Sequence, residues 1–123
     1  MIYLASPYSH PDPVEREKRY LEAMRKLRLY ILEGIACFSP IVHSHEMAKI
    51  YNMGRAWEAW QQYNKEMLKH CWEVHILTLD GWRESEGIKQ EIAWASEFEI
   101  PCLEVSPVGE IVRITNPIEV SHG

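Results

Sequence analysis

The residues best suited to do chemistry lie on one predicted helix, at about residues 86–98. At 100° per residue this helix has an apolar arc that includes Ile88, Trp94 and Ala95, and Glu91 falls inside that arc. A carboxylate on the buried side of a helix is costly unless it is paired, protonated or placed at a solvated cleft. The pattern therefore leaves two interpretations open: a glutamate that borders or pairs within the core, and a working carboxylate in a cleft.

The start of the same helix has the makings of an anion site. Ser85 and Gly87 place a hydroxyl, a flexible residue and unpaired backbone N–H groups at its first turn. Taken alone, Ser85 is more simply explained as an N-cap. Six residues of helix rise about 9 Å, and side chains lean toward the N-terminus. The Glu91 carboxylate would then lie within reach of an anion at Ser85, a spacing that suits the phosphate and C1′ of one ribose phosphate.

A second polar residue interrupts the apolar face of the helix predicted at 56–72. Asn64 lies there among Trp57, Trp60, Met67, Leu68 and Cys71. A buried amide needs hydrogen-bond partners, so Asn64 is either satisfied within the core or shares a cleft with Glu91.

Other motifs give weaker signals. His43, His45 and Glu46 are metal-ligand types, but an isolated H-x-H without a fixed partner favours loop or substrate contacts, so we expect no metal. Trp82 lies in a predicted ligand loop, where an indole can stack on a base. The sequence contains no Walker loop, G-x-G-x-x-G or G-x-S-x-G, and it predicts no cofactor.

Length and composition set wider limits. The 123 residues suit one domain, with 46% hydrophobic and 25% charged residues. A net charge of -5 argues against binding a nucleic-acid polymer, although local donors can still hold one phosphate. No apolar run approaches the roughly 20 residues of a membrane span, and the first residues read as a strand and not as a signal peptide. Three scattered cysteines predict a reducing, cytoplasmic setting.

The remaining pattern predicts an α/β fold. Strands are expected at 2–5, 35–39, 74–79, 100–105 and 110–114, and helices at 13–33, 56–72 and 86–98, with 41–54 irregular or weakly helical. Asp12 and Pro13 should begin the first helix, and Gly34 should end it. Such alternation predicts a mostly parallel sheet, which binds ligands beyond the carboxyl ends of its strands. The loops at 6–12, 39–45 and 80–85 are therefore the expected ligand loops.

Three blocks, at residues 2–8, 38–40 and 80–91, resemble the nucleoside 2-deoxyribosyltransferase-like superfamily and, within it, DUF1937-type proteins. The resemblance implies a Rossmann-like three-layer sandwich over residues 1–123, with a sheet of about five strands and helices on both faces. It also implies a homo-oligomer in which a neighbour completes the site, for which Asn116 is a candidate.

The resemblance assigns roles to individual residues. Glu91 matches the nucleophile that attacks C1′ with retention, and Tyr3 matches the tyrosine that orients it. Asn64 lies near the position of an acid that protonates the leaving base, which an amide cannot replace. Ser85 stands where transferases have an aspartate and nucleoside 5′-monophosphate N-glycosidases have a serine, and a serine donates to a phosphate that an aspartate would repel. The remaining predicted substrate contacts are Ser6, Pro7, Ser39, Asp80, Gly81, Trp82, Gly87 and Asn116.

The sequence therefore favours an N-glycosidase acting on a (deoxy)nucleoside 5′-monophosphate, with a small-molecule nucleotide or nucleoside as its partner. Three alternatives stay open: base exchange by a 2-deoxyribosyltransferase, a non-catalytic nucleotide-binding module favoured by Asn64, and an interaction protein that uses its tryptophan-rich helix.

Overall fold

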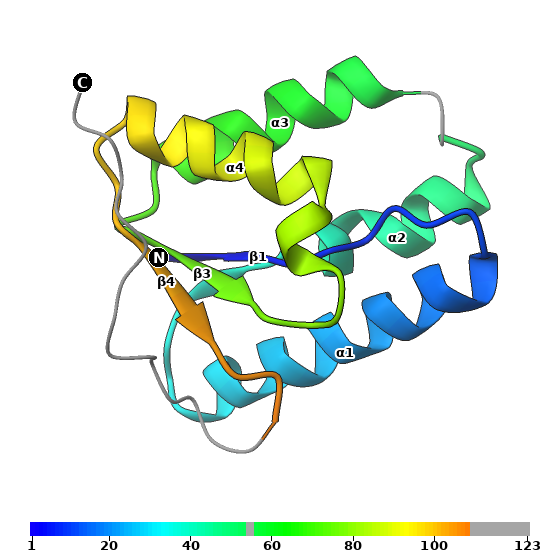
Figure 1. Cartoon of the computed structure of the whole chain (residues 1–123), viewed down its shortest axis with the longest axis horizontal. Coiled ribbons are helices and arrows are strands. Elements are labelled where there is room, and N and C mark those ends of the chain that lie inside the picture. The colour runs from blue at the N-terminus through cyan, green and yellow to red at the C-terminus, as the bar shows by residue number, and fades with distance from the viewer. Residues whose placement is uncertain (54–55, 109–123) are drawn as a thin grey trace.

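The computed structural model describes residues 1–53 and 56–108, with only the backbone of Trp57. In this part of the chain four strands form one parallel sheet in the order β2-β1-β3-β4 (Figure 1). The strands are β1 (Ile2–Ala5), β2 (Cys37–Phe38), β3 (Glu73–Leu77) and β4 (Cys102–Val105). The helices are α1 (Pro13–Leu32), α2 (Pro40–Ile50), α3 (Trp57–Lys69) and α4 (Glu86–Glu97), with a short 3₁₀ turn, η1 (Trp82–Glu84), before α4.

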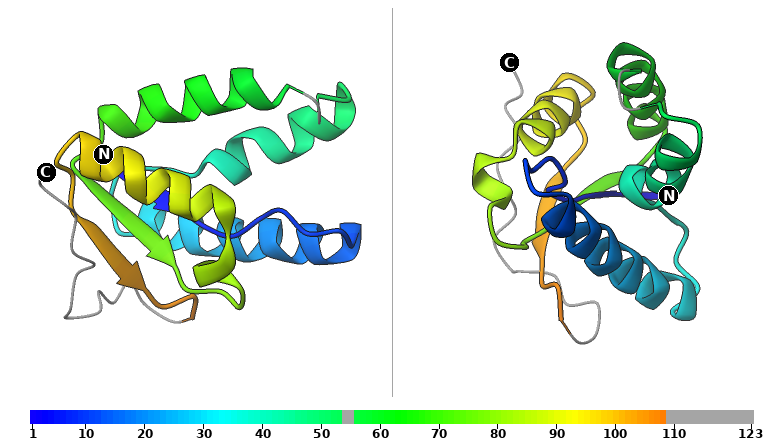
Figure 2. Two further views of the ribbon diagram at one scale, coloured as in Figure 1. Left: turned by 45° about the horizontal axis from the view of Figure 1, so that its top comes forward. Right: turned by 90° about the vertical axis from the view of Figure 1, so that its right-hand side faces the viewer.

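Helices cover both faces of the sheet, as the sequence predicts. Strand side chains alternate between the two faces. Tyr3 and Ala5 of β1 pack into the cluster under α3 and α4, whereas Ile2 and Leu4 pack with Tyr30 of α1. Figures 1 and 2 show α3 and α4 on one face and α1 on the other. The predicted three-layer α/β class is confirmed.

The strand order creates a place for a ligand. From β1 the chain crosses to β2 on one side and later returns to β3 on the other. The loops that leave β1 and β3 therefore run to opposite faces, and in such sheets the crevice between them is the usual binding position. Ser6 follows β1 directly, and the segment 78–85 joins β3 to α4.

Local signals explain most element boundaries. The Asp12 side chain accepts a hydrogen bond from the Val14 N–H at 2.9 Å, so Asp12 caps α1 as predicted. Gly34, just past α1, has φ +72, a left-handed conformation that glycine adopts without strain. β3 ends at Leu77, earlier than predicted, because Leu79 N–H turns back to the Leu77 carbonyl.

The largest difference from the sequence prediction is α2. We expected residues 41–54 to be irregular or weakly helical, whereas Pro40–Ile50 is a regular helix. Ser39 caps it by accepting the Val42 N–H at 3.2 Å, and Pro40 occupies the first turn. The predicted strand at 35–39 is correspondingly reduced to Cys37–Phe38.

The fifth predicted strand, 110–114, lies outside the described residues, and so does Asn116. Within residues 1–53 and 56–108, none of the helices has the length and apolar character that a membrane crossing requires.

Candidate active site

A cavity of about 530 Å³ opens over the carboxyl ends of β1 and β3. Its walls come from the loop after β1 and from α1, α2, α3 and α4. Five residues that the sequence singles out share this wall: Ser6, Asn64, Ser85, Gly87 and Glu91. They come from three separate segments of the chain that the fold brings to one wall.

Glu91 is the one carboxylate among the described residues that line the cavity. It lies in the second turn of α4, and only 8% of it is exposed. Burial raises the pKa of Glu91 from its ordinary 4.5 to about 8, and the nearby Tyr3 hydroxyl partly opposes that rise. Burial therefore favours the neutral, protonated form of Glu91.

Tyr3 lies beside Glu91, on the strand at the centre of the sheet. Its side chain is fully buried, and burial followed by the charge of Glu91 raises its pKa well above the usual value. Within the described residues, the buried Ser6 hydroxyl lines the cavity and has no partner at hydrogen-bonding distance. The Tyr3 hydroxyl is buried against the Glu91 carboxyl, and each group shifts the pKa of the other. An unsatisfied buried hydroxyl costs about 1–3 kcal/mol, so Ser6 is available to bind a polar group of a ligand.

Ser85 has both of the roles that its position in the sequence allowed. Its Oγ accepts the Ile88 N–H at 3.2 Å and so caps α4, and the residue also lines the cavity. Accepting that bond leaves the hydroxyl proton to donate to a ligand. The α4 N-terminus adds a partial positive charge at the same point.

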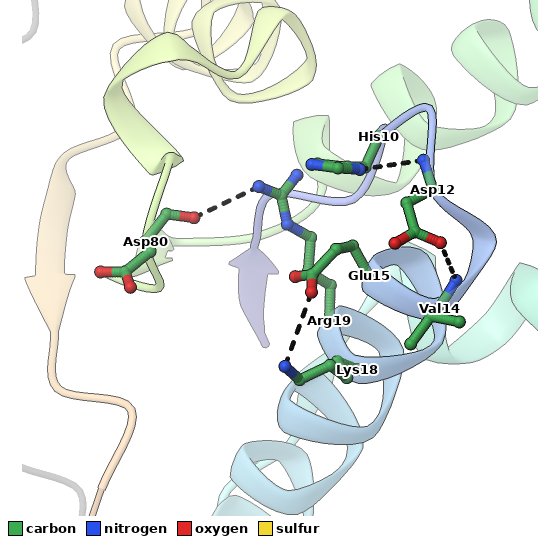
Figure 3. Close-up of polar contacts among 7 residues, drawn as sticks. All are labelled: His10, Asp12, Val14, Glu15, Lys18, Arg19 and Asp80. Atoms are coloured by element: carbon green, nitrogen blue, oxygen red, sulfur yellow. Dashed lines mark hydrogen bonds and ion pairs between the residues drawn. The ribbon is translucent and has the colours of Figure 1, made fainter.

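Residues 78–84, which follow β3, lie outside the cavity wall, and Arg19 of α1 hydrogen-bonds to this segment. Figure 3 shows the Arg19 guanidinium reaching the Asp80 backbone. It donates to the Asp80 carbonyl at 3.3 Å and to the Ser9 carbonyl at 3.0 Å, which ties together the two loops that flank the cavity. Gly81 has φ +88, and a Cβ there would lie 2.8 Å from Arg19 Nη2. Asp80 and Gly81 thus position α4, and their predicted contact with substrate stays a prediction.

Three more predicted contacts are not in the cavity wall of the described structure. Ser39 is buried as the α2 cap, and Pro7 is buried in the loop that follows β1. Trp82 packs against the core and carries the Arg83 guanidinium 4.8 Å from its ring centroid. Stacking of Trp82 on a base therefore stays a prediction.

A hydrogen-bonded chain that the sequence did not predict forms another part of the wall. The Tyr8 hydroxyl lies 2.6 Å from His45 Nδ1, and His45 Nε2 lies 2.7 Å from a Glu17 carboxylate oxygen. The Tyr20 ring stacks on His45 at 4.0 Å, which fixes the plane of the imidazole. The H-x-H pattern pointed to His45, but its partners come from other elements and could not be read from spacing.

Cations and metal ligands are few around this cavity. Arg16 is the one lysine or arginine among the described lining residues, and it donates to the His10 carbonyl. The side chains of Glu17, His45 and Glu46 offer three potential metal-ligand atoms within 4.8 Å of one another. His43 is not part of that group, since it stacks on Tyr63.

Comparison with known proteins agrees with this architecture, which is a nucleoside deoxyribosyltransferase-like fold. A solved structure of 2-deoxyribosyltransferase from the psychrotolerant bacterium Bacillus psychrosaccharolyticus matches with a TM-score of 0.59 and 22% identity, over 90% of this chain and 75% of that one. At this identity the match shows a shared fold. The family model "Domain of unknown function (DUF1937)" matches residues 1–106, so the chain belongs to the DUF1937 family. No curated protein sequence matches it.

Proposed function

We propose that this protein hydrolyses the base–sugar bond of a (deoxy)nucleoside 5′-monophosphate with Glu91 as the nucleophile. The observation that carries the proposal is the position of Glu91, a buried carboxyl in the wall of a cavity that also includes the capped N-terminus of α4. The structural relative named a 2-deoxyribosyltransferase supports chemistry at the same sugar carbon.

The proposed reaction has two displacements at C1′. The Glu91 carboxylate attacks C1′ as the base leaves, and a glycosyl ester forms; water then hydrolyses this ester with overall retention. Tyr3 orients the carboxylate and donates to it when it is ionised. Because the pKa of Glu91 is about 8, ionisation limits the rate at neutral pH unless the positive charge that develops on the sugar favours the carboxylate.

The phosphate is assigned to the Ser85 end of the cavity. There the Ser85 hydroxyl and the α4 N-terminus supply donors. Arg16 is the one lysine or arginine among the described lining residues, and its guanidinium adds a positive charge to the cavity as a whole. The unpartnered Ser6 hydroxyl is a further donor for phosphate or sugar oxygens.

Asn64 favours a second candidate function, a nucleotide-binding module without turnover. It lines the cavity where the resemblance places an acid, and an amide cannot give up a proton to the leaving base. Base exchange differs from hydrolysis only in whether a second base or water resolves the ester, so it is tested in the same assay.

The test is a panel of nucleosides and nucleoside 5′-monophosphates, with free base measured by chromatography. Wild-type protein should release base from monophosphates faster than from nucleosides, and 2-deoxy-2-fluoro analogues should leave a glycosyl adduct on Glu91 visible by mass spectrometry. Glu91→Gln should lower release by about 1,000-fold or more. Glu86→Gln, on an exposed residue of the same helix outside the cavity wall, is the matched control.

Three results would count against the proposal. Release that Glu91→Gln leaves unchanged removes the assigned nucleophile. Tight nucleotide binding with no release across the whole panel supports the binding module instead, and product nucleoside formed only when a second base is added supports base exchange.

A further inference from the structure

The proposed reaction needs a proton that the expected position does not supply. A neutral base leaves C1′ far more readily when a nitrogen of its ring is protonated, and general acids contribute about 10²–10⁴-fold to such steps. Asn64 has no such proton, and Glu91 is the only carboxyl group in the described cavity wall. A proton donor for the base must therefore come from another lining residue.

The chain from Tyr8 through His45 to Glu17 has the required composition and position. Tyr8 and His45 both line the cavity, and their side chains lie 2.6 Å apart, whereas Glu17 holds the far side of the imidazole at 2.7 Å. His45 is only 7% exposed, and Tyr20 stacks on its ring. The Glu17 carboxylate fixes the orientation of that ring, in the arrangement by which a carboxylate holds the histidine of hydrolases.

We propose that Tyr8 is the general acid that protonates the leaving base, and that the His45–Glu17 pair resupplies its proton. This inference rests on the proposed function, because it assigns the proton donor of that same reaction. Tyr8 is the catalytic residue of the chain, and His45 and Glu17 act through it.

The proton and electron balance closes within the residues named. In the first step the C1′–N bond breaks with its electron pair going to the base, and a C1′–O bond forms to Glu91. The Tyr8 O–H proton moves to the base nitrogen, and the proton on His45 Nδ1 moves to the Tyr8 oxygen. In the second step water adds its oxygen to C1′, Glu91 leaves as a carboxylate, and the proton of the water returns through Tyr8 to His45.

A second chain of the same three residue types provides a control within the molecule. Tyr30 of α1 lies 2.6 Å from His75 Nδ1, and His75 Nε2 lies 2.9 Å from Glu73. Tyr30 and His75 are fully buried between α1 and the sheet, and neither lines the cavity. Removing the Tyr30 hydroxyl thus perturbs the same kind of hydrogen bond without touching a substrate.

The experiment compares two leaving groups in wild type, Tyr8→Phe, Glu17→Gln and the control Tyr30→Phe. One substrate is the natural monophosphate cleaved fastest in the panel, and the other is 4-nitrophenyl 2-deoxyribofuranoside 5-phosphate, whose nitrophenolate leaves without a proton. Tyr8→Phe should slow the natural nucleotide about 100-fold or more and the nitrophenyl substrate less than threefold. Glu17→Gln should show the same selectivity with a smaller effect, and Tyr30→Phe should show no selectivity.

Solvent deuterium isotope effects on kcat give a second reading with the natural nucleotide alone. If a proton is transferred in the rate-limiting step, wild type should show a clear isotope effect, and this effect should fall toward unity in Tyr8→Phe. Equal slowing of both substrates by Tyr8→Phe, with an unchanged isotope effect, would overturn the proton-donor assignment while leaving the glycosidase proposal standing. If wild-type protein and Glu91→Gln release base from the nucleotide and nitrophenolate from the nitrophenyl substrate at equal rates, the glycosidase proposal itself fails.

Discussion

Two places in the molecule carry the same Tyr–His–Glu arrangement in different surroundings, and α1 contributes a residue to each. At the cavity, Tyr8 of the first loop is hydrogen-bonded to His45 of α2, and His45 is hydrogen-bonded to Glu17 of α1. Tyr8 and His45 line the cavity, so a ligand can reach them. Under α1, the arrangement of Tyr30, His75 and Glu73 has nearly equal distances but is closed off by the helix. Residue type and spacing are thus insufficient to identify a catalytic chain.

What separates the two chains is access to the cavity. A buried histidine that two short hydrogen bonds satisfy stabilises the fold, because its polar atoms would otherwise lose free energy on burial. The same histidine at the edge of a cavity can also exchange protons with a ligand. Substitutions in the Tyr30–His75–Glu73 chain should therefore affect mainly stability. Substitutions in the Tyr8–His45–Glu17 chain should affect mainly activity.

The largest expected effect comes from replacing the histidine of each chain. His75→Ala should lower the free energy of unfolding by about 3 kcal/mol, because it opens a void and removes the hydrogen bonds of His75 to Tyr30 and Glu73. His45→Ala should cost less stability but should reduce nucleotide cleavage more strongly than His75→Ala does in folded protein. Urea unfolding and base release of both variants test this, and matching profiles for the two would end the distinction.

The next effect concerns the charge at the helix tip of the cavity. Ser85→Asp should lower cleavage of monophosphates about 100-fold and leave cleavage of nucleosides nearly unchanged, because a carboxylate there repels phosphate. Ser85→Asn is the matched control, since asparagine caps a helix as well as aspartate does but carries no charge. Equal losses in the two variants would show that the serine acts only as a cap.

The sequence predicted those features that depend on local pattern. The burial of Glu91 follows from its place in the apolar arc of α4, and the Asp12 cap follows from Asp12-Pro13. The regular α2 was missed even though Ser39-Pro40 is the same kind of start signal, because the histidines and weak periodicity after it favoured an irregular segment. The convergence of Ser85 and Glu91 on one wall could be expected because one helix carries both.

The Tyr8–His45–Glu17 chain could not be predicted in the same way. Glu17 and His45 are 28 residues apart, and Tyr8 and His45 are 37 apart. No periodicity links a loop residue to residues of two different helices, so only the packing of α1 against α2 brings them together. The resemblance predicts Glu91 as the nucleophile and places the acid near Asn64, whose amide has no proton to give.

A third effect follows from the ionisation of Glu91. Its pKa is about 8 in the folded protein and should be near the ordinary 4.5 when the chain is unfolded. Between these values the folded state holds one proton more, so stability falls as pH rises from about 4.5 to 8, by about 1.4 kcal/mol per pH unit at most. Urea midpoints of wild type should fall relative to those of Glu91→Gln across this range, and parallel curves would mean that Glu91 is ionised throughout.

The same ionisation predicts the pH dependence of the reaction. The nucleophile must be a carboxylate, so kcat/KM for the free enzyme should increase as pH rises toward about 8. Stability and activity then change in opposite directions over one pH range, as expected when one group is both buried and reactive.

The smallest expected effect concerns Arg19, on the helix that contributes to both chains. Arg19 belongs to α1, which covers the closed chain, but its guanidinium holds the Ser9 and Asp80 carbonyls beside the cavity. Arg19→Lys keeps the charge but cannot span both carbonyls, so KM should rise about threefold to tenfold with little change in kcat. Arg25→Lys is the control, because Arg25 forms an exposed pair with Glu22 on the same helix. If Arg19→Lys instead lowers stability and leaves KM unchanged, the two Arg19 hydrogen bonds stabilise the fold, and the two loops keep their positions without them.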